Sequence, residues 1–349
     1  MAELRERYDN LDGLRVISCL AIIGMHIRVN GHYEIGENAI EIVGSWTHLV
    51  PLFLMISGFG MFCGYYEKCK SGEIDLNIFY TNRYKKILPF FTTLILVDVM
   101  MDRTFAHVIE GITEATLVFG LLPNNNPSVI GVSWTLGVIF LFYMLFPFFV
   151  YLCWTKKRAW ASFAASIVLS IFCANYFFSD SFVVEGFSDR HNFLYCAPFF
   201  IGGGTAYLNR DTIKRCISRH RCLCFAGCAS LIFFWYVIPN EINNFDTMML
   251  KNLILFLPWL MYAITVDSKI LSNKVMKYLS GISLELYLAQ MVIFRFVEKA
   301  KCLYLFGRGW TSFVAVWILV VAGLIAFVEL WKWVSQVVFK IFTQVGTRY

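Results

Sequence analysis

Long runs of apolar residues alternate with short polar segments along almost the whole chain. These runs recur from residue 14 to residue 339, and most are close to the roughly 20 residues with which a helix crosses the hydrocarbon core of a bilayer. No interval between them has room for a soluble domain. The pattern therefore predicts an all-α, polytopic membrane bundle of about ten transmembrane helices that forms a single domain over residues 1–349. The predicted spans are 14–29, 46–66, 87–101, 131–153, 159–177, 191–208, 222–238, 249–266, 280–297 and 312–339.

The third and the last of these spans depart from the usual length. Because 87–101 is short, we expect its helix to extend into the flanking polar residues, whereas 312–339 is long enough to tilt or to run out along the membrane surface. The first span follows a segment that contains both Glu and Arg, and no small-residue cleavage site comes after it. We interpret it as a retained span and not as a removed signal peptide.

Positive charge is distributed unevenly between the segments that join the spans. Short loops rich in Lys and Arg remain on the cytoplasmic side of a membrane. Of the 30 Lys and Arg residues, 20 fall in alternate segments that begin with the N-terminal one, six fall in the intervening segments, and four lie within or at the edges of spans. This asymmetry predicts a multi-pass protein of the cell (inner or plasma) membrane with both termini in the cytoplasm.

Composition and charge exclude several other classes of protein. Apolar residues make up 58% of the chain and charged residues 15%, which is outside the usual range of soluble domains. The net charge of +6 does not indicate a nucleic-acid partner, because the basic residues are spread over all the predicted inner loops and form no single face. Membrane lipids are the expected surroundings.

The 11 cysteines indicate neither disulfides nor a metal site. Nearly all lie within apolar runs or on the predicted cytoplasmic side, where disulfides are rare. Several cysteines and a histidine cluster at residues 216–228, but their spacing matches no standard zinc finger, and packing of small side chains is the better explanation. We therefore predict no bound metal.

Two ionisable residues lie in the first predicted span, within the segment LDGLRVISCLAIIGMHI. Arg15 is near its inner end and His26 follows eleven residues later. In a helix this spacing is three turns plus roughly 20°, so the two side chains share one face and lie about 16 Å apart along the axis. Ionisable residues inside a bilayer are costly and often functional. The alternative is that Arg15 extends to the inner headgroups and that His26 forms hydrogen bonds within the bundle.

Four further motifs follow in order, namely FLMISGF at 53–59, RYKKILP at 83–89, SWTLGVIFLFYMLFP at 133–147 and LSGISLELYLAQ at 279–290. With the Arg and His of the first span, they make the chain resemble the acyltransferase type 3 family, a group of integral membrane acyltransferases that often O-acetylate surface polysaccharides. The resemblance covers nearly the whole chain. It departs from the family pattern where Ile139 replaces a Glu, Gln290 replaces a His and Lys86 replaces an Arg. These three substitutions concern the type of acceptor and any proton relay that depends on the missing groups.

The resemblance implies transfer of an acyl group, usually acetyl from acetyl-CoA, from the cytoplasm to a hydroxyl of an extracytoplasmic carbohydrate or lipid-linked glycan. Arg83 and Lys86, one helical turn apart at the inner face, would bind the phosphates of the coenzyme, and Arg15 would bind or orient the donor. His26 would act as the general base, because a neutral imidazole accepts a proton near pH 7. A covalent acyl-histidine is the alternative route. The alternative for the basic residues is retention of inner loops by charge, which explains Lys85 better than it explains Arg83 and Lys86.

Four other residues are candidates for substrate binding. His48 begins the second span from the outer side, at a depth similar to that of the first-span histidine. Glu285 lies within the ninth span and needs a partner such as Arg15 or water. Trp134 and Tyr143 can stack on a sugar. The alternative for these aromatic residues and for His48 is contact with lipid headgroups at the ends of spans.

Two other functions stay open at this point. A transporter or flippase of glycans or lipids uses broken helices and buried charges as a path, but the two halves of the chain show no corresponding pair of interrupted spans. A non-catalytic scaffold in envelope assembly is the other alternative, and Ile139 and Gln290 favour it. Binding of CoA separates an acyltransferase from both.

Overall fold

The computed structural model describes residues 8–121, 129–173, 191–238 and 245–346. Within these ranges the regular structure is helical, and one isolated bridge joins Leu305 to Gly307. In chain order the helices are α1 (Asp9–Asn30), α2 (Glu37–Ser45), the 3-10 helix η1 (Trp46–Leu49), α3 (Val50–Lys70), α4 (Leu76–Met101), α5 (Phe105–Ala115), the 3-10 helix η2 (Phe119–Leu121), α6 (Trp134–Met144), α7 (Phe146–Leu152), α8 (Lys156–Phe172), α9 (Phe193–Leu208), α10 (Arg210–Arg219), α11 (Arg221–Val237), α12 (Phe245–Ala263), α13 (Lys274–Gly281), α14 (Ser283–Lys299) and α15 (Trp310–Gly346).

Each predicted span coincides with one of these helices or with two consecutive helices. The expected extension of the third span is confirmed, because α4 begins at Leu76, well before the apolar run. Asp75 caps this helix by accepting a hydrogen bond from the Ile78 amide at 2.9 Å. The basic motif therefore belongs to α4. Residues 174–177 of the fifth predicted span lie outside the described residues.

Three described helical stretches are long and apolar enough to cross a membrane by themselves: Asp9–Asn30, Glu37–Lys70 and Trp310–Val338. Three bent pairs raise the number to six if each pair is one span; the bends are 61° between α6 and α7, 102° between α10 and α11, and 67° between α13 and α14. The chain is therefore a multi-span helical membrane protein. The predicted number of about ten is larger because it includes short helices, such as α9 with its 16 residues.

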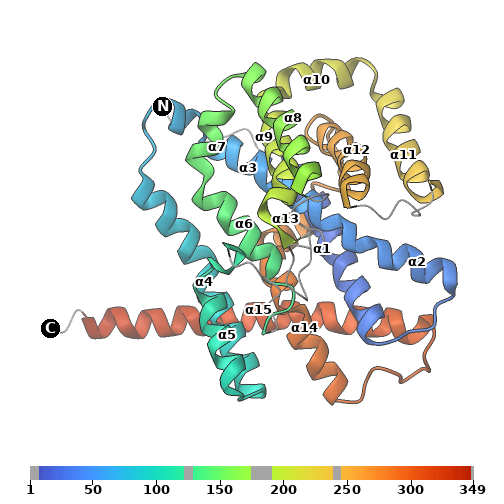
Figure 1. Ribbon diagram of the computed structural model, residues 1–349. Helices are drawn as coiled ribbons and strands as arrows, with labels where there is room; N and C mark the ends of the chain where they lie inside the picture. Colours follow the sequence, from blue (N-terminus) through green and yellow to red (C-terminus); the bar gives the residue numbers. More distant parts are fainter. Residues whose placement is uncertain (1–7, 122–128, 174–190, 239–244, 347–349) are drawn as a thin grey trace.

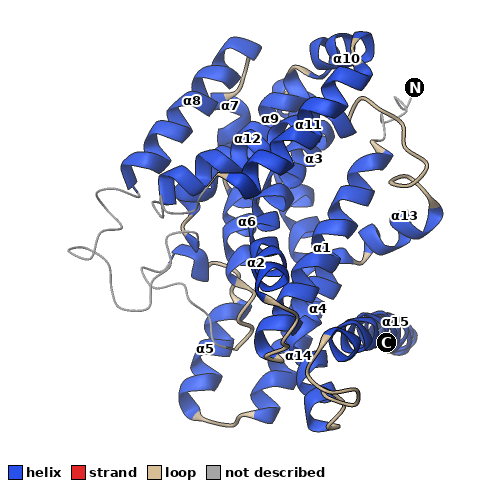
Figure 2. Ribbon diagram, turned by 90° about the vertical axis from the view of Figure 1, so that its right-hand side faces the viewer, coloured by secondary structure: helices blue, strands red, loops and turns tan. Residues whose placement is uncertain are grey.

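Helix α15 runs across the other helices of the bundle (Figure 1), and a view turned by 90° shows it nearly end-on (Figure 2). Its first half packs against α1 and α14. There the Trp317 indole donates a hydrogen bond to the Leu20 carbonyl at 3.1 Å. Its C-terminal part extends beyond the bundle (Figure 1) and exposes apolar side chains that include Leu330 and Trp333. In a membrane protein such a surface is solvated by lipid chains.

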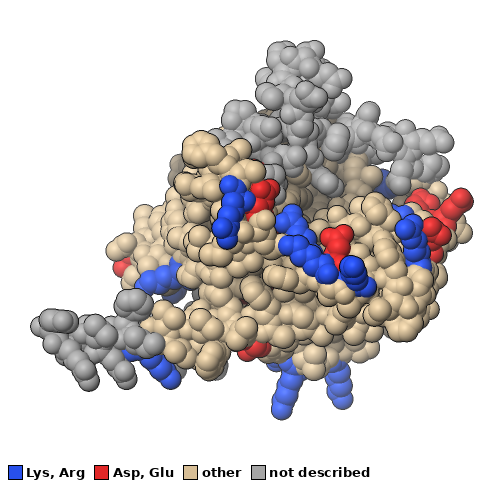
Figure 3. Space-filling model, turned by 90° about the horizontal axis from the view of Figure 1, so that it is seen from below, with Lys and Arg blue, Asp and Glu red and all other residues tan. Residues whose placement is uncertain are grey.

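Charged side chains are sparse on one face of the molecule (Figure 3). On the face drawn in Figure 3, Lys and Arg lie in small groups among uncharged residues. This distribution suits a molecule whose surface lies largely in lipid, where a charged side chain costs several kcal/mol at the bilayer centre.

Buried side chains form two hydrophobic clusters. One joins α1, α4, α14 and α15, and the other joins α3, α7, α9 and α12. Trp134 and Tyr143 of α6 pack against both clusters. The two cavities described below lie near the boundary between the two clusters. Helix α6 and the first half of α3 line this boundary.

Helices α3 and α9 pack with their backbones in close approach. A Cβ atom at Gly203 of α9 would collide with the Met55 carbonyl oxygen of α3, and one at Gly58 of α3 would collide with the Phe200 carbonyl oxygen of α9. Small residues allow membrane helices to approach in this way. The absence of side chains at these two positions therefore sets the distance between α3 and α9.

Replacing Gly203 by alanine is expected to destabilise the protein, because the added methyl group has no space against the α3 backbone. Overpacking of this kind costs about 1–3 kcal/mol. Gly227 on α11 is a matched control, since a Cβ atom there meets nothing within 4 Å. Gly227→Ala should leave stability unchanged or raise it slightly. The midpoint of thermal unfolding in detergent measures both variants, and equal midpoints would contradict the packing described.

Candidate active site

Two adjoining cavities lie between α1, α3, α4, α6 and the bend between α13 and α14. The deep cavity has a volume of about 150 Å³ and reaches from Ser280 to Val50 and Thr135. The entrance cavity has a volume of about 480 Å³ and is lined by the N-terminal turns of α1 and by the second half of α3. Five side chains line both cavities and so form the junction between them: Arg15, Ser57, Arg83, Lys86 and Tyr143.

Arg15 is fixed at this junction by hydrogen bonds. Its Nη1 donates to Ser280 Oγ at 3.3 Å, and Ser280 Oγ donates to Asp12 Oδ1 at 2.7 Å. A chain of polar contacts therefore joins α1 to α13 and holds the guanidinium in place. Ser280 was not among the predicted site residues, because 265 positions separate it from Arg15 and only the tertiary fold brings them together.

The Arg83 guanidinium is held by aromatic rings. Its Nη2 donates a hydrogen bond to Tyr65 OH at 2.6 Å. Its central carbon lies 5.1 Å from the ring centre of Tyr65, 5.4 Å from that of Phe79 and 5.3 Å from that of Tyr143, within the range of cation–π attraction. Tyr143 OH is in turn 3.0 Å from Ser57 Oγ. Tyr143 thus lies inside the site and supports Arg83.

Lys86 lies one turn further along α4 and is exposed toward both cavities. None of the hydrogen bonds or ion pairs of the described residues involves its ammonium group. The neighbouring Lys85 lines neither cavity. Three cations, Arg15, Arg83 and Lys86, therefore meet at one junction from two helices. An anionic ligand would be stabilised there by charge-assisted hydrogen bonds.

Glu285 of α14 lines the deep cavity. The expected pairing with Arg15 is not formed, because the Arg15 hydrogen bond goes to Ser280. The Glu285 Oε2 atom is buried and has no hydrogen-bond partner among the described residues, although the positive charge of Lys86 acts on the carboxylate. A buried acceptor without a partner costs about 1–3 kcal/mol. Glu285 is therefore suited to accept a hydrogen bond from a ligand in this cavity.

His26 lines neither of the two cavities and lies near the C-terminal end of α1. Helices α1 and α14 run side by side, and Cys19 Sγ contacts the Ser283 carbonyl at 3.4 Å, an offset of 264 residues. Further along, Asn30 Nδ2 lies 4.0 Å from Met291 Sδ, an offset of 261 residues, so His26 is level with the turn of α14 from Tyr287 to Gln290. Gln290 is 2% exposed; its Nε2 donates to the Tyr287 carbonyl at 2.8 Å, and its Oε1 is buried with no hydrogen-bond partner in the described part of the chain.

Two of the predicted binding residues lie apart from these cavities. His48 lines a separate apolar cavity, where its ring centre is 5.5 Å from that of Trp235. The Trp134 ring stacks on His191 with ring centres 4.2 Å apart. One face of this indole is therefore covered by an imidazole. Of the four candidates for substrate binding, Tyr143 and Glu285 are the two that join the basic residues in one cavity.

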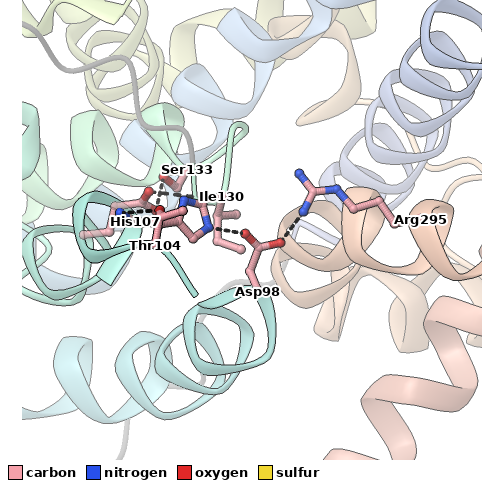
Figure 4. Close-up of polar contacts among 7 residues, drawn as sticks. Asp98, Thr104, His107, Ile130, Ser133 and Arg295 are labelled. Carbon is pink, nitrogen blue, oxygen red and sulfur yellow. Dashed lines mark hydrogen bonds and ion pairs between the residues drawn. The ribbon is translucent and has the colours of Figure 1, made fainter. Parts of the chain in front are cut away.

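A buried polar network joins α4, α5 and α14 (Figure 4). The Asp98 carboxylate is 1% exposed and accepts hydrogen bonds from His107 Nε2 at 2.9 Å and from Arg295 Nη1. Thr104 caps α5 by accepting from the His107 amide at 3.3 Å. This network was not predicted from the sequence, although Asp98 interrupts an apolar run and such residues are candidates for function or for buried pairing.

Glu114 fixes the end of α5 to the segment that leads into α6, of which Ile130 and Ser133 are labelled in Figure 4. It is 1% exposed, and its oxygens accept hydrogen bonds from Ser133 Oγ at 2.9 Å and from the Ile130 amide at 3.3 Å. Burial raises the pKa of Glu114 to about 7, although these hydrogen bonds oppose the shift. Glu114 lies between the third and fourth predicted spans, outside the membrane-spanning segments.

The raised pKa of Glu114 is expected to make stability depend on pH. The folded protein holds this proton more tightly than the unfolded chain, so the contribution of Glu114 is fully present below the ordinary pKa of 4.5 and is lost as pH rises through about 7. The variant Glu114→Gln has no such dependence. Its unfolding midpoint relative to wild type should therefore rise between about pH 5 and about pH 8. A relative midpoint that is the same at both pH values would contradict this account.

Comparison with known proteins relates most of the chain to one family. A sequence model described as an acyltransferase domain matches residues 8–331. The match includes His26 and every residue that lines the two cavities. No curated protein and no solved structure matches the chain.

Proposed function

Because the chain belongs to the acyltransferase type 3 family and is therefore a membrane acyltransferase, we propose that it moves an acetyl group from cytoplasmic acetyl-CoA to a hydroxyl of an extracytoplasmic carbohydrate or lipid-linked glycan. In this proposal about ten helices cross the cell membrane, and both termini lie in the cytoplasm. The entrance cavity then opens toward the cytoplasm, because the first turns of α1 and the later turns of α3 line it.

The convergence of Arg15, Arg83 and Lys86 carries the proposal. Coenzyme A bears a pyrophosphate and a 3′-phosphate, and a site for it needs several cations at the cytoplasmic end of the bundle. Retention of an inner loop by charge requires only that Lys and Arg lie on that side. It does not require Arg83 and Lys86 to line the same cavities as Arg15 while Lys85 lines neither.

The donor extends from the entrance cavity through the junction into the deep cavity. Its phosphates bind Arg83 and Lys86, and its pantetheine arm passes Arg15. Amide N–H groups of the pantetheine arm are donors, and the Glu285 Oε2 atom is a buried acceptor without a partner among the described residues. Glu285 therefore accepts a hydrogen bond from this arm and directs the thioester toward the outer half of α1.

His26 is the general base of the transfer. It removes the proton from the acceptor hydroxyl, the oxygen attacks the thioester carbonyl, the C–S bond breaks, and the CoA thiolate takes the proton from the imidazolium. The products are the acetyl ester and free CoA. The distance of about 16 Å along α1 between Arg15 and His26 is spanned by the pantetheine arm. Transfer through an acyl-histidine remains the alternative route.

Binding of CoA to the purified protein tests the proposal. A ligand that binds the folded state at 100 times its Kd stabilises it by about 2.7 kcal/mol, so CoA should raise the unfolding midpoint, and dephospho-CoA, which lacks the 3′-phosphate, should raise it less. Proteoliposomes that contain labelled acetyl-CoA should then transfer label to an external glycan acceptor. A transporter or a scaffold would respond to neither test, and either failure in the wild type would contradict the proposed function.

A further inference from the structure

A third cavity of about 690 Å³ lies between α1, η1, α11, α12 and α15. This volume falls within the range of small-molecule sites, about 300–1,000 Å³. Nearly all of its lining is apolar and includes four tryptophans, Trp46, Trp235, Trp259 and Trp317. We call this cavity the tryptophan groove. It belongs to neither the entrance cavity nor the deep cavity, and the acyl donor has no role there.

The tryptophan groove opens at the lipid-facing surface. Ile17 of α1 and Ile232 of α11 line it, and they are 46% and 42% exposed. Both belong to predicted spans. Water is excluded at that depth, because an apolar surface there offers it no hydrogen bonds. Hydrocarbon chains are therefore the surrounding medium, and a long lipid chain has the shape and chemistry to fill the groove.

Polar groups gather at one end of the tryptophan groove. His48 lies against Trp235, and Ser45 Oγ is 2.9 Å from Tyr236 OH. Lys251 lies just outside the lining, where its Nζ is 5.0 Å from the Trp235 ring centre and donates to the Ile238 carbonyl at 3.3 Å. The Trp235 side chain is 7% exposed, and its indole nitrogen is buried with no hydrogen-bond partner among the described residues. The apolar groove can hold the chain of a lipid. Lys251, His48 and the Trp235 indole N–H at one end can bind an anionic headgroup.

This polar end lies close to the level of His26. Trp317 packs against Gly24, where a Cβ atom would come within 2.9 Å of the indole, and its ring centre is 5.7 Å from that of Trp46. Both tryptophans line the groove. Gly24 precedes His26 by two residues, a rise of about 3 Å along the helix. A headgroup at this end of the groove is thus near the depth of the proposed base. Two residues are also about 200° around the helix, so Gly24 and the groove lie on the side of α1 opposite His26.

We propose that the tryptophan groove binds the hydrocarbon chain of the acceptor's lipid anchor and that Lys251 and His48 hold its phosphate. This inference rests on the proposed function and narrows it, because the acceptor is then a lipid-linked glycan and not a free polysaccharide. The chain of the anchor lies in the groove, and the glycan extends from the phosphate around the outer end of α1, which ends at Asn30, to His26.

Two pairs of variants test the lipid site. Ile232→Trp fills the groove, and Leu223→Trp is its control, since Leu223 is on the same helix, is 73% exposed and does not line the groove. Lys251→Gln removes the cation, and Lys299→Gln removes an exposed lysine elsewhere. Binding of a polyprenyl phosphate and of phosphatidylglycerol is measured by native mass spectrometry of each full-length protein. Transfer of acetyl is measured with a lipid-linked glycan and with the same glycan free in solution.

Wild type and both controls should bind the polyprenyl phosphate, and Ile232→Trp and Lys251→Gln should each lose about tenfold or more in affinity. Transfer to the lipid-linked glycan should fall in the same two variants, while stabilisation by CoA stays at the wild-type level. Equal binding by Ile232→Trp and Leu223→Trp would overturn the proposal, and so would equally tight binding of phosphatidylglycerol by wild type. Failure of CoA to stabilise wild type would instead refute the proposed acyl transfer, so the two failures are distinguishable.

Discussion

His26→Ala is expected to lose acetyl transfer by about 10²- to 10⁴-fold, the usual contribution of a general base. The same variant should bind CoA as wild type does, because His26 lines neither the entrance cavity nor the deep cavity. The measurement is transfer of labelled acetyl from acetyl-CoA to the glycan acceptor, with the unfolding midpoint in saturating CoA as the readout of donor binding. Loss of transfer with intact donor binding would place the role of His26 in the chemical step.

The control for this prediction is His220→Ala, which removes an exposed imidazole between α10 and α11. It should keep wild-type transfer. Full activity in His26→Ala would remove His26 from the mechanism. Loss of transfer together with loss of CoA binding would show that the imidazole serves packing between α1 and its neighbours. Neither outcome tests whether Arg83 and Lys86 bind the donor, and that requires a separate experiment.

Lys86→Gln is expected to weaken CoA binding by about ten- to a hundredfold. A hydrogen bond to a charged group contributes about 1.5–3 kcal/mol, and about 1.4 kcal/mol corresponds to a factor of ten in Kd. Arg83→Gln should have an effect of similar size. Arg83 is already held by Tyr65 and Tyr143, so its guanidinium loses little conformational freedom when a phosphate binds. Titration of CoA by calorimetry or by thermal shift measures the Kd.

Lys85→Gln is the matched control, because it removes an equal charge one residue away that faces neither cavity. It should change the Kd of CoA little. The contrast should persist at high salt, since the exposed charge of Lys85 is screened while a charge that faces a cavity is screened less. If Lys85→Gln and Lys86→Gln weakened binding equally, the basic motif would act only through the overall charge of the cytoplasmic face, and the cavity would not be a phosphate site.

Much of the architecture follows from the sequence because a bilayer permits few solutions. Backbone groups in hydrocarbon must be hydrogen-bonded within the segment, so the apolar runs had to be helices, and the structure has helices at every predicted span. The extension of α4 through the basic motif was predictable for the same reason. The number of crossings was not, since length and composition alone support three to six spans among the described helices.

The candidate site was predictable only in part. Arg15, Arg83, Lys86, Tyr143 and Glu285 were predicted, and the structure gathers all five around the deep cavity. Ser280 and Tyr65, which hold the two arginines, were missed because their hydrogen bonds depend on which helices become neighbours. The network around Asp98 was missed for a different reason, since the carboxylate was visible in an apolar run but its partners come from two other helices.

The sequence by itself determined that this is a helical membrane protein with an arginine and a histidine on one face of its first span, because hydropathy, helical periodicity and chain length act locally. Only the tertiary structure decided that the basic motif of α4 meets Arg15 and that a tryptophan groove lies against the opposite side of α1. Those relations depend on close packing between segments far apart in the chain, as between Gly203 and Met55, and no local pattern of residues specifies them.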